Sequence, residues 1–297
     1  MSTIRVNFRI SFVLMTCLLS PGIVWAEQSE AVISTGQESG SYYSIGERLR
    51  TAMRLQHGIE VRVETSFGSI QNLARLADPS SEISIALTQA DALSRFLNDN
   101  PDFSNQFIVL GDMGRECALL ITGRASGVAR FADLKKLPGA EIAVNDLGSG
   151  AAVTFGFMMA MNPELVDVTL VYVDTMEALL QMKVAGVHTD LKAAMLVQRP
   201  STRSAAVQVL LENSADYRLI PIRASDVTNL TLPDGSVVYT FEKVNIGNSR
   251  GAATLEVETL CTRGLLLASK RKLSREIRSK FAKSMLESSK TVIGSDE

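Results

Sequence analysis

Histidine is scarce in this sequence, with two in 297 residues. Neither His57 nor His188 stands near a cysteine, the other histidine or a cluster of carboxylates, so the usual zinc-binding patterns are missing. A serine hydrolase needs a histidine base beside its nucleophile, and the Gly-x-Ser-x-Gly elbow and the P-loop are missing too. These absences favour a binding protein, with no catalytic residue, metal or cofactor. A carboxylate-based enzyme stays open as an alternative.

An excess of basic charge is also missing, because 30 Lys and Arg stand against 32 Asp and Glu. No basic excess is available to neutralise a phosphate backbone, which argues against nucleic acid as a partner. Apolar runs of membrane-spanning length are absent as well.

The N-terminus reads as a secretory signal peptide, residues 1–26. Arg5 and Arg9 precede the apolar run 10–19, and Val24-Trp25-Ala26 offers a cleavage site. The alternative is an uncleaved N-terminal anchor. We expect a periplasmic protein, secreted through this signal peptide, and a monomer.

Cysteine is scarce, with three in the sequence. Cys17 leaves with the signal peptide, so Cys117 and Cys261 remain, each in an apolar run. In an oxidising compartment the two can form a disulfide across neighbouring strands. Two separate buried thiols are the alternative.

What the sequence does contain is a regular alternation of strand and helix signals. Short apolar runs rich in β-branched residues alternate with segments that repeat apolar residues every three or four positions. Strands are predicted at 59–64, 83–87, 107–110, 118–122, 141–144, 168–173, 191–197 and 217–222. Such βα units indicate an α/β fold with a parallel sheet covered by helices.

Two stretches, 32–46 and 141–155, repeat the same order of strand, Gly/Ser loop and helix. A helix N-terminus after such a loop presents unpaired N–H groups and a positive dipole end, which bind anions. Two such points facing each other form a cleft that closes on a small polar ligand by hinge motion. The alternative is two ordinary βα turns with nothing bound.

The residues also resemble a known family of solute receptors. The segment 35–46, with its Gly/Ser loop and Tyr-Tyr pair, resembles the opening loop of the TAXI family, the receptors of one type of TRAP transporter. The segments 66–73 and 85–91 are similar to its next two signatures, and 131–134 with 148–150 to the entry of its second lobe.

The resemblance implies a two-lobed type II periplasmic-binding-protein fold with the ligand cleft between the lobes. Lobe 1 is expected at 27–115, with residues 250–297 returning to it, and lobe 2 at 116–249. The implied function is capture of a small carboxylate by lobe closure and delivery to TRAP transporter membrane subunits. The carboxylate is a dicarboxylate, a 2-oxoacid or a glutamate-like amino acid. The ligand-binding residues are expected to be Gly40, Ser41, Tyr43, Ser69, Asn72, Gln89, Ser149 and Gly150.

Three departures from the family bear on the ligand. Ala151 and Ala152 replace a threonine and an acidic residue, and Glu38 places a negative charge in the first loop. Arg199 follows a strand where the family tends to have glycine. Arg199 either clamps a carboxylate or lies on the surface. A sensor of the same fold, signalling to a membrane partner, is the alternative function.

Overall fold

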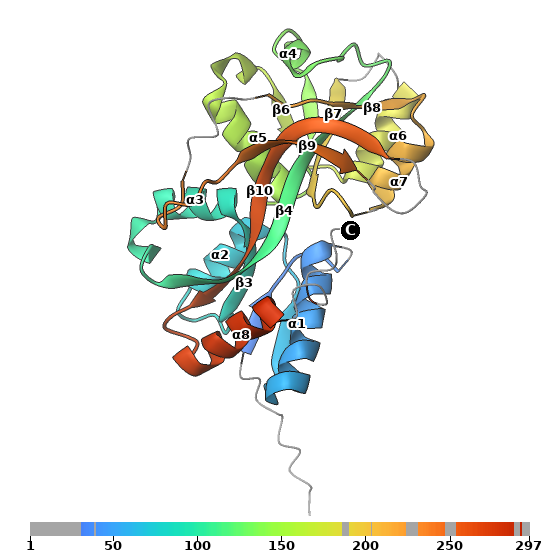
Figure 1. Ribbon diagram of the computed structural model, residues 1–297. Coiled ribbons are helices and arrows are strands. Elements are labelled where there is room, and N and C mark those ends of the chain that lie inside the picture. Colours follow the sequence, from blue (N-terminus) through green and yellow to red (C-terminus); the bar gives the residue numbers. More distant parts are fainter. Residues whose placement is uncertain are drawn as a thin grey trace, which may run out of the picture.

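The computed structural model describes residues 31–38, 40–185, 190–202, 204–223, 231–246, 254–287 and 292. Within these ranges ten strands form one mixed sheet, and helices cover it in two lobes (Figure 1). The predicted signal peptide 1–26, Ser39 and His188 lie outside the described residues.

The strands of the sheet are short except for two. They are β1 (Ala31–Ser34), β2 (Val61–Glu64), β3 (Ile85–Gln89), β4 (Phe107–Gly123), β5 (Glu141–Ala143), β6 (Thr169–Val171), β7 (Leu191–Gln198), β8 (Tyr217–Ile220), β9 (Thr240–Ile246) and β10 (Leu255–Ser269). The helices are α1 (Ser41–His57), α2 (Ser69–Ala77), α3 (Ala90–Asp99), α4 (Phe131–Leu134), α5 (Gly150–Met161), α6 (Thr175–Ala185), α7 (Ala205–Glu212) and α8 (Arg275–Glu287), with short 3-10 turns at Pro101–Phe103 and Pro163–Leu165.

Each lobe has a parallel core. In lobe 1, which comprises β1 to β3, α1 to α3 and α8, strand β1 pairs in parallel with β2 and β3. In lobe 2, which comprises β5 to β9 and α4 to α7, strand β5 pairs in parallel with β6 and β7. Loops that follow parallel strands leave the sheet at the same edge, so each lobe gathers its strand ends on one side. This confirms the predicted two-lobed α/β fold.

The two long strands, β4 and β10, join the lobes and are called the hinge pair below. They run antiparallel side by side from one lobe to the other (Figure 1). The lobe 1 end of β10 pairs with β3, and its lobe 2 end pairs with β9. Register shifts between Arg263 and Leu265 and between Leu266 and Leu267 mark where the pairing is irregular. The lobes are thus connected through a weakened stretch of sheet.

The hinge pair departs from the sequence expectations in two ways. Residues 107–110 and 118–122 were expected to be separate strands, and they are parts of the single strand β4. The expected lobe boundary at 115/116 therefore lies inside a strand. On β10, the partner changes from β9 to β3 between Cys261 and Gly264, later than the expected return at residue 250.

A disulfide joins the two hinge strands. Cys117 of β4 and Cys261 of β10 are directly opposite in the register, with Cα atoms 4.0 Å apart, and their sulfurs are bonded. Of the two alternatives open from the sequence, the structure has the disulfide. It fixes the alignment of the hinge strands beside the irregular stretch.

The lobes pack against each other along α3 and α5. One buried apolar cluster includes Ala90 and Leu93 of α3 together with Ala151 and Phe155 of α5. Full burial of a large side chain such as Leu93 or Phe155 contributes roughly 1.5–3 kcal/mol relative to exposure. The structure is therefore a closed arrangement of the two lobes. Among the described helices, none is long and apolar enough to span a membrane.

Candidate functional site

The first predicted anion-binding point lies at the N-terminus of α1. The apolar stripe of α1 consists of Ile45, Leu49 and Met53. It is buried, as the spacing of four residues predicts. Gly40 is the N-cap and offers no side chain to the first turn, so the N–H groups there have no side-chain cap. Ser41 and Tyr43 are partly exposed in this turn. The start of α1 therefore has no side-chain cap, and its role in ligand binding stays a prediction.

The second predicted point, at the N-terminus of α5, differs in its capping. Ser149 is the N-cap, and its hydroxyl accepts from the Ala152 N–H at 3.2 Å and donates to the Val144 carbonyl at 2.7 Å. This hydroxyl is engaged within lobe 2 as a helix cap. Ligand contact at this helix end is left to backbone N–H groups.

The two loops touch across the cleft. The Gln37 amide donates to the carboxylate of Asp146, and the Ile70 N–H donates to the Gly148 carbonyl at 3.4 Å. Gly68 packs so closely that an added Cβ would lie 2.8 Å from the Gly148 oxygen. The predicted facing of the two loops is therefore present, with the lobes closed on each other.

Gln89 of lobe 1 and Gly150 of lobe 2 are in close contact. A Cβ added at Gly150 would lie 2.3 Å from Gln89 Oε1, so a side chain there displaces Gln89. Gln89 is buried, and its Nε2 donates to Glu116 Oε2 at 2.9 Å. Its Oε1 is buried without a hydrogen-bond partner among the described residues. A buried amide oxygen left in this way points to a donor that a ligand supplies.

Glu116 of the hinge strand β4 lies at the centre of this region. Its side chain is 4% exposed, and its Oε2 accepts from the Tyr42 hydroxyl at 3.0 Å as well as from Gln89. Burial raises the pKa of the Glu116 carboxyl to about 7, while both hydrogen bonds and the charge of Arg199 lower it. Burial, followed by the charge of Glu116, raises the pKa of Tyr42 well above its usual value.

Asp91 is a second buried carboxylate at the start of α3. It accepts from Thr154 Oγ1 of α5 at 2.6 Å, from the Tyr239 hydroxyl at 2.8 Å and from the Ala92 N–H at 2.8 Å. Burial raises the pKa of Asp91, and the hydrogen bonds from Thr154 and Tyr239 oppose that increase. Asp91 thus ties lobe 1 to two segments of lobe 2.

Arg199 follows β7 and is buried, with 6% of its surface exposed. Of the two alternatives open from the sequence, a surface position is therefore wrong. Its charge lowers the pKa values of Glu116 and Tyr42, so it lies within electrostatic reach of both. We call Tyr42, Gln89, Asp91, Glu116 and Arg199 the interlobe site.

Asn72 and Ser69 lie behind the interlobe site and hold lobe 1 together. Asn72 is fully buried, accepts from the Ser34 hydroxyl at 2.6 Å and donates to the carbonyls of Leu87, at 2.7 Å, and of Thr35. Ser69 Oγ accepts from the Gln89 N–H at 3.2 Å. Both amide hydrogens of Asn72 are used within the lobe, so a role as a direct ligand donor does not fit the structure.

The predicted ligand-binding residues do not include Tyr42, Asp91 and Glu116 of the interlobe site, or Tyr239, which donates to Asp91. The expected tyrosine was Tyr43, and the neighbouring Tyr42 is the one that reaches Glu116. Glu116 carries a detectable signal, because it is a charge directly before the apolar run that starts at Cys117. Tyr239 carries none, because it approaches Asp91 from 148 residues away. The described residues hold no group of three or more His, Cys, Asp or Glu that fits a metal ion.

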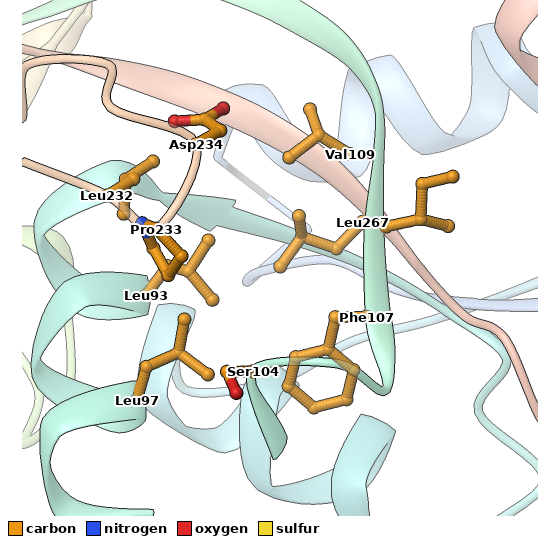
Figure 2. Close-up of a pocket in the computed structure, with 10 residues that line it drawn as sticks. Leu93, Leu97, Ser104, Phe107, Val109, Leu232, Pro233, Asp234 and Leu267 are labelled. Atoms are coloured by element: carbon orange, nitrogen blue, oxygen red, sulfur yellow. The ribbon is translucent and has the colours of Figure 1, made fainter. Parts of the chain in front are cut away.

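A separate apolar cavity of about 220 Å³ lies on the lobe 1 side, outside the interlobe site (Figure 2). Leu93 and Leu97 of α3, Phe107 of β4 and Leu267 of β10 form its walls, and the turn at Pro233 closes one side. Its lining offers few polar groups to orient a ligand.

Comparison with known proteins agrees with this architecture. XAC2383 from Xanthomonas citri bound to chloride ion is 11% identical, with 89% of this chain and 85% of that chain covered and a TM-score of 0.53. A structure described as a periplasmic transporter is 13% identical, with 90% and 85% covered and a TM-score of 0.51. At these identities the likeness shows the fold alone. No curated protein matches the sequence. A family model does, over residues 33–295, and the chain belongs to the NMT1-like family.

Proposed function

We propose that this protein is an extracytoplasmic solute receptor of the TAXI type. It captures a small carboxylate by closure of its lobes and delivers it unchanged to the membrane subunits of a TRAP transporter. The observation that carries the proposal is the interlobe site, in which buried polar side chains from both lobes meet beside the hinge pair. Polar groups of this kind between two hinged lobes bind a ligand that enters when the lobes separate.

Two positive features beside the cleft support a carboxylate as the ligand. The N-terminus of α1 has no side-chain cap, and Arg199 contributes a buried guanidinium on the lobe 2 side. Helix N-termini and guanidinium groups both bind carboxylates. The TAXI assignment and the TRAP partner rest on the sequence resemblance, and periplasmic localisation on the predicted signal peptide.

A thermal-shift screen of small carboxylates and amino acids on the mature protein tests the proposal. A ligand at 100 times its dissociation constant stabilises the folded state by about 2.7 kcal/mol. Arg199→Gln should remove that shift, whereas Arg130→Gln, on an exposed position of lobe 2, should keep it. No shift with any small anion contradicts the proposal.

Turnover and partner are tested separately. NMR spectra of the bound compound after prolonged incubation should show it unchanged, and a new product would establish an enzyme. Uptake into vesicles that contain TRAP membrane subunits should require the receptor and respond to its ligand. If uptake is absent and a co-purified membrane sensor responds instead, the protein is a sensor.

A further inference from the structure

The interlobe site holds more negative than positive charge. The charged groups that face Glu116 are Asp91, at the start of α3, and Arg199, after β7. The other groups packed against it are neutral: Tyr42 of α1, Gln89 of β3 and Gly264 of β10. Two acids thus share one guanidinium in a region closed off from solvent.

The two acids are not held equally. The oxygens of Asp91 accept from three donors. In Glu116 both donors reach Oε2, while Oε1 lies against the hinge strand, 3.2 Å from where a Cβ on Gly264 would be. Donors to a carboxylate favour its charged form. Glu116 is therefore the acid that accepts a proton more readily.

Closing the lobes on an anion adds another negative charge to this region. Buried charges without compensation are strongly destabilising, and like charges held close together favour protonation of one of them. Compensation comes from one of two sources, a proton on the protein or a cation on the ligand.

Resting on the function proposed above, we propose that Glu116 is a specificity-determining residue that matches the charge of the ligand. It takes up one proton when the cleft closes on a fully anionic ligand, and it stays ionised opposite a ligand that carries an ammonium group. The raised pKa of Glu116, about 7 without ligand, makes this proton exchange accessible near neutral pH.

Two probes that differ only in the group of interest test this inference. 2-Oxoglutarate and L-glutamate share their carbon chain and both carboxylates, and only L-glutamate has an ammonium group. Titration calorimetry in buffers of different protonation enthalpy counts the protons taken up on binding. Uptake by the wild type with 2-oxoglutarate should rise from about half a proton at pH 7 to nearly one at pH 8.5, and the rise of the dissociation constant should approach roughly tenfold per pH unit over that range. With L-glutamate we expect no uptake.

Glu116→Gln should make 2-oxoglutarate binding independent of pH and should weaken L-glutamate binding at least about tenfold, because an ionised partner for the ammonium is lost. Asp112→Asn, which neutralises an exposed acid on the same strand, should leave both behaviours as in the wild type. Binding of 2-oxoglutarate without proton uptake overturns the inference and leaves the receptor function standing. If neither probe binds at any pH and other carboxylates also fail, both are overturned.

Discussion

The start of α1 and the start of α5 follow the same sequence plan, and the structure uses them differently. At α1 the N-cap is Gly40, which leaves the first turn without a side-chain cap, while at α5 the hydroxyl of Ser149 caps the helix. Behind α1, polar side chains such as Asn72 and Gln89 are buried and bonded within lobe 1 or to the hinge pair. The comparison shows that two loops of similar sequence can differ in how the helix that follows is capped.

The largest effect is expected on the lobe 1 side, at Asn72. Asn72→Ala leaves the Ser34 hydroxyl and the carbonyls of Thr35 and Leu87 without their partner, which should lower the free energy of unfolding by about 4 kcal/mol. Urea unfolding measures it, with Asn98→Ala, an exposed position on α3, as the control. Unchanged stability together with lost ligand binding would return Asn72 to the role of a ligand contact.

Glu116 should make the stability of the protein depend on pH. Its folded-state pKa of about 7 is above the unfolded value of 4.5, so the folded state binds more protons between these values. Its contribution to stability is fully present below pH 4.5 and is lost as the pH rises to about 7, a change of about 3 kcal/mol. Unfolding of the wild type and of Glu116→Gln across pH 4 to 8 measures it. Parallel curves for the two proteins contradict the prediction.

Gly150→Ala should hold the N-termini of α1 and α5 further apart. The added methyl group displaces Gln89 from its contact with residue 150, so closure of the lobes should be hindered. Carboxylate affinity should fall about tenfold, which corresponds to about 1.4 kcal/mol. Calorimetry measures the affinity and small-angle scattering the mean separation of the lobes. Gly156→Ala is the control, because its Cβ would meet Arg95 Nη1 at an ordinary 3.8 Å. Equal affinities for the two variants would show that the contact does not limit closure.

The smallest effect is expected at Ser149. Ser149→Ala removes the cap of α5 and should lower the free energy of unfolding by about 1 kcal/mol, with little change in ligand affinity. Ser149→Thr should restore most of the loss, because threonine also caps helices. Thermal unfolding without ligand measures the stability of each variant. Thermal unfolding over a series of ligand concentrations, up to saturation, measures the change in affinity. A large loss of affinity at unchanged stability would make Ser149 a ligand contact and remove the difference between the two helix ends.

The fold was predictable because its signals are local. A β-branched run, a glycine loop and a helical stripe such as Ile45, Leu49 and Met53 occur within a few residues of each other. The single strand β4 was not recognised, because Gly111 and the polar residues up to Glu116 interrupt its apolar pattern where it crosses between the lobes.

The arrangement of the candidate site was predictable in part: the two predicted loops face each other, as Gln37 and Asp146 show, but the partners of individual side chains were not predictable. Strand ends and helix starts locate the cleft, since ligands bind at such edges. Whether an amide such as that of Asn72 faces a ligand or a carbonyl depends on groups brought together by folding. The same holds for Asp91, whose partner Tyr239 lies 148 residues away in the sequence. These contacts cannot be predicted from local sequence patterns.

The path of the chain through the hinge pair also sets an order of assembly. The chain enters lobe 2 along β4 and leaves it along β10, so lobe 2 is built from one continuous stretch. Lobe 1 receives the strand that pairs with β3, and the helix α8 that covers it, from the last part of the chain. Pairings between distant segments form slowly. Lobe 2 is therefore able to fold first, and lobe 1 is completed by the C-terminal residues.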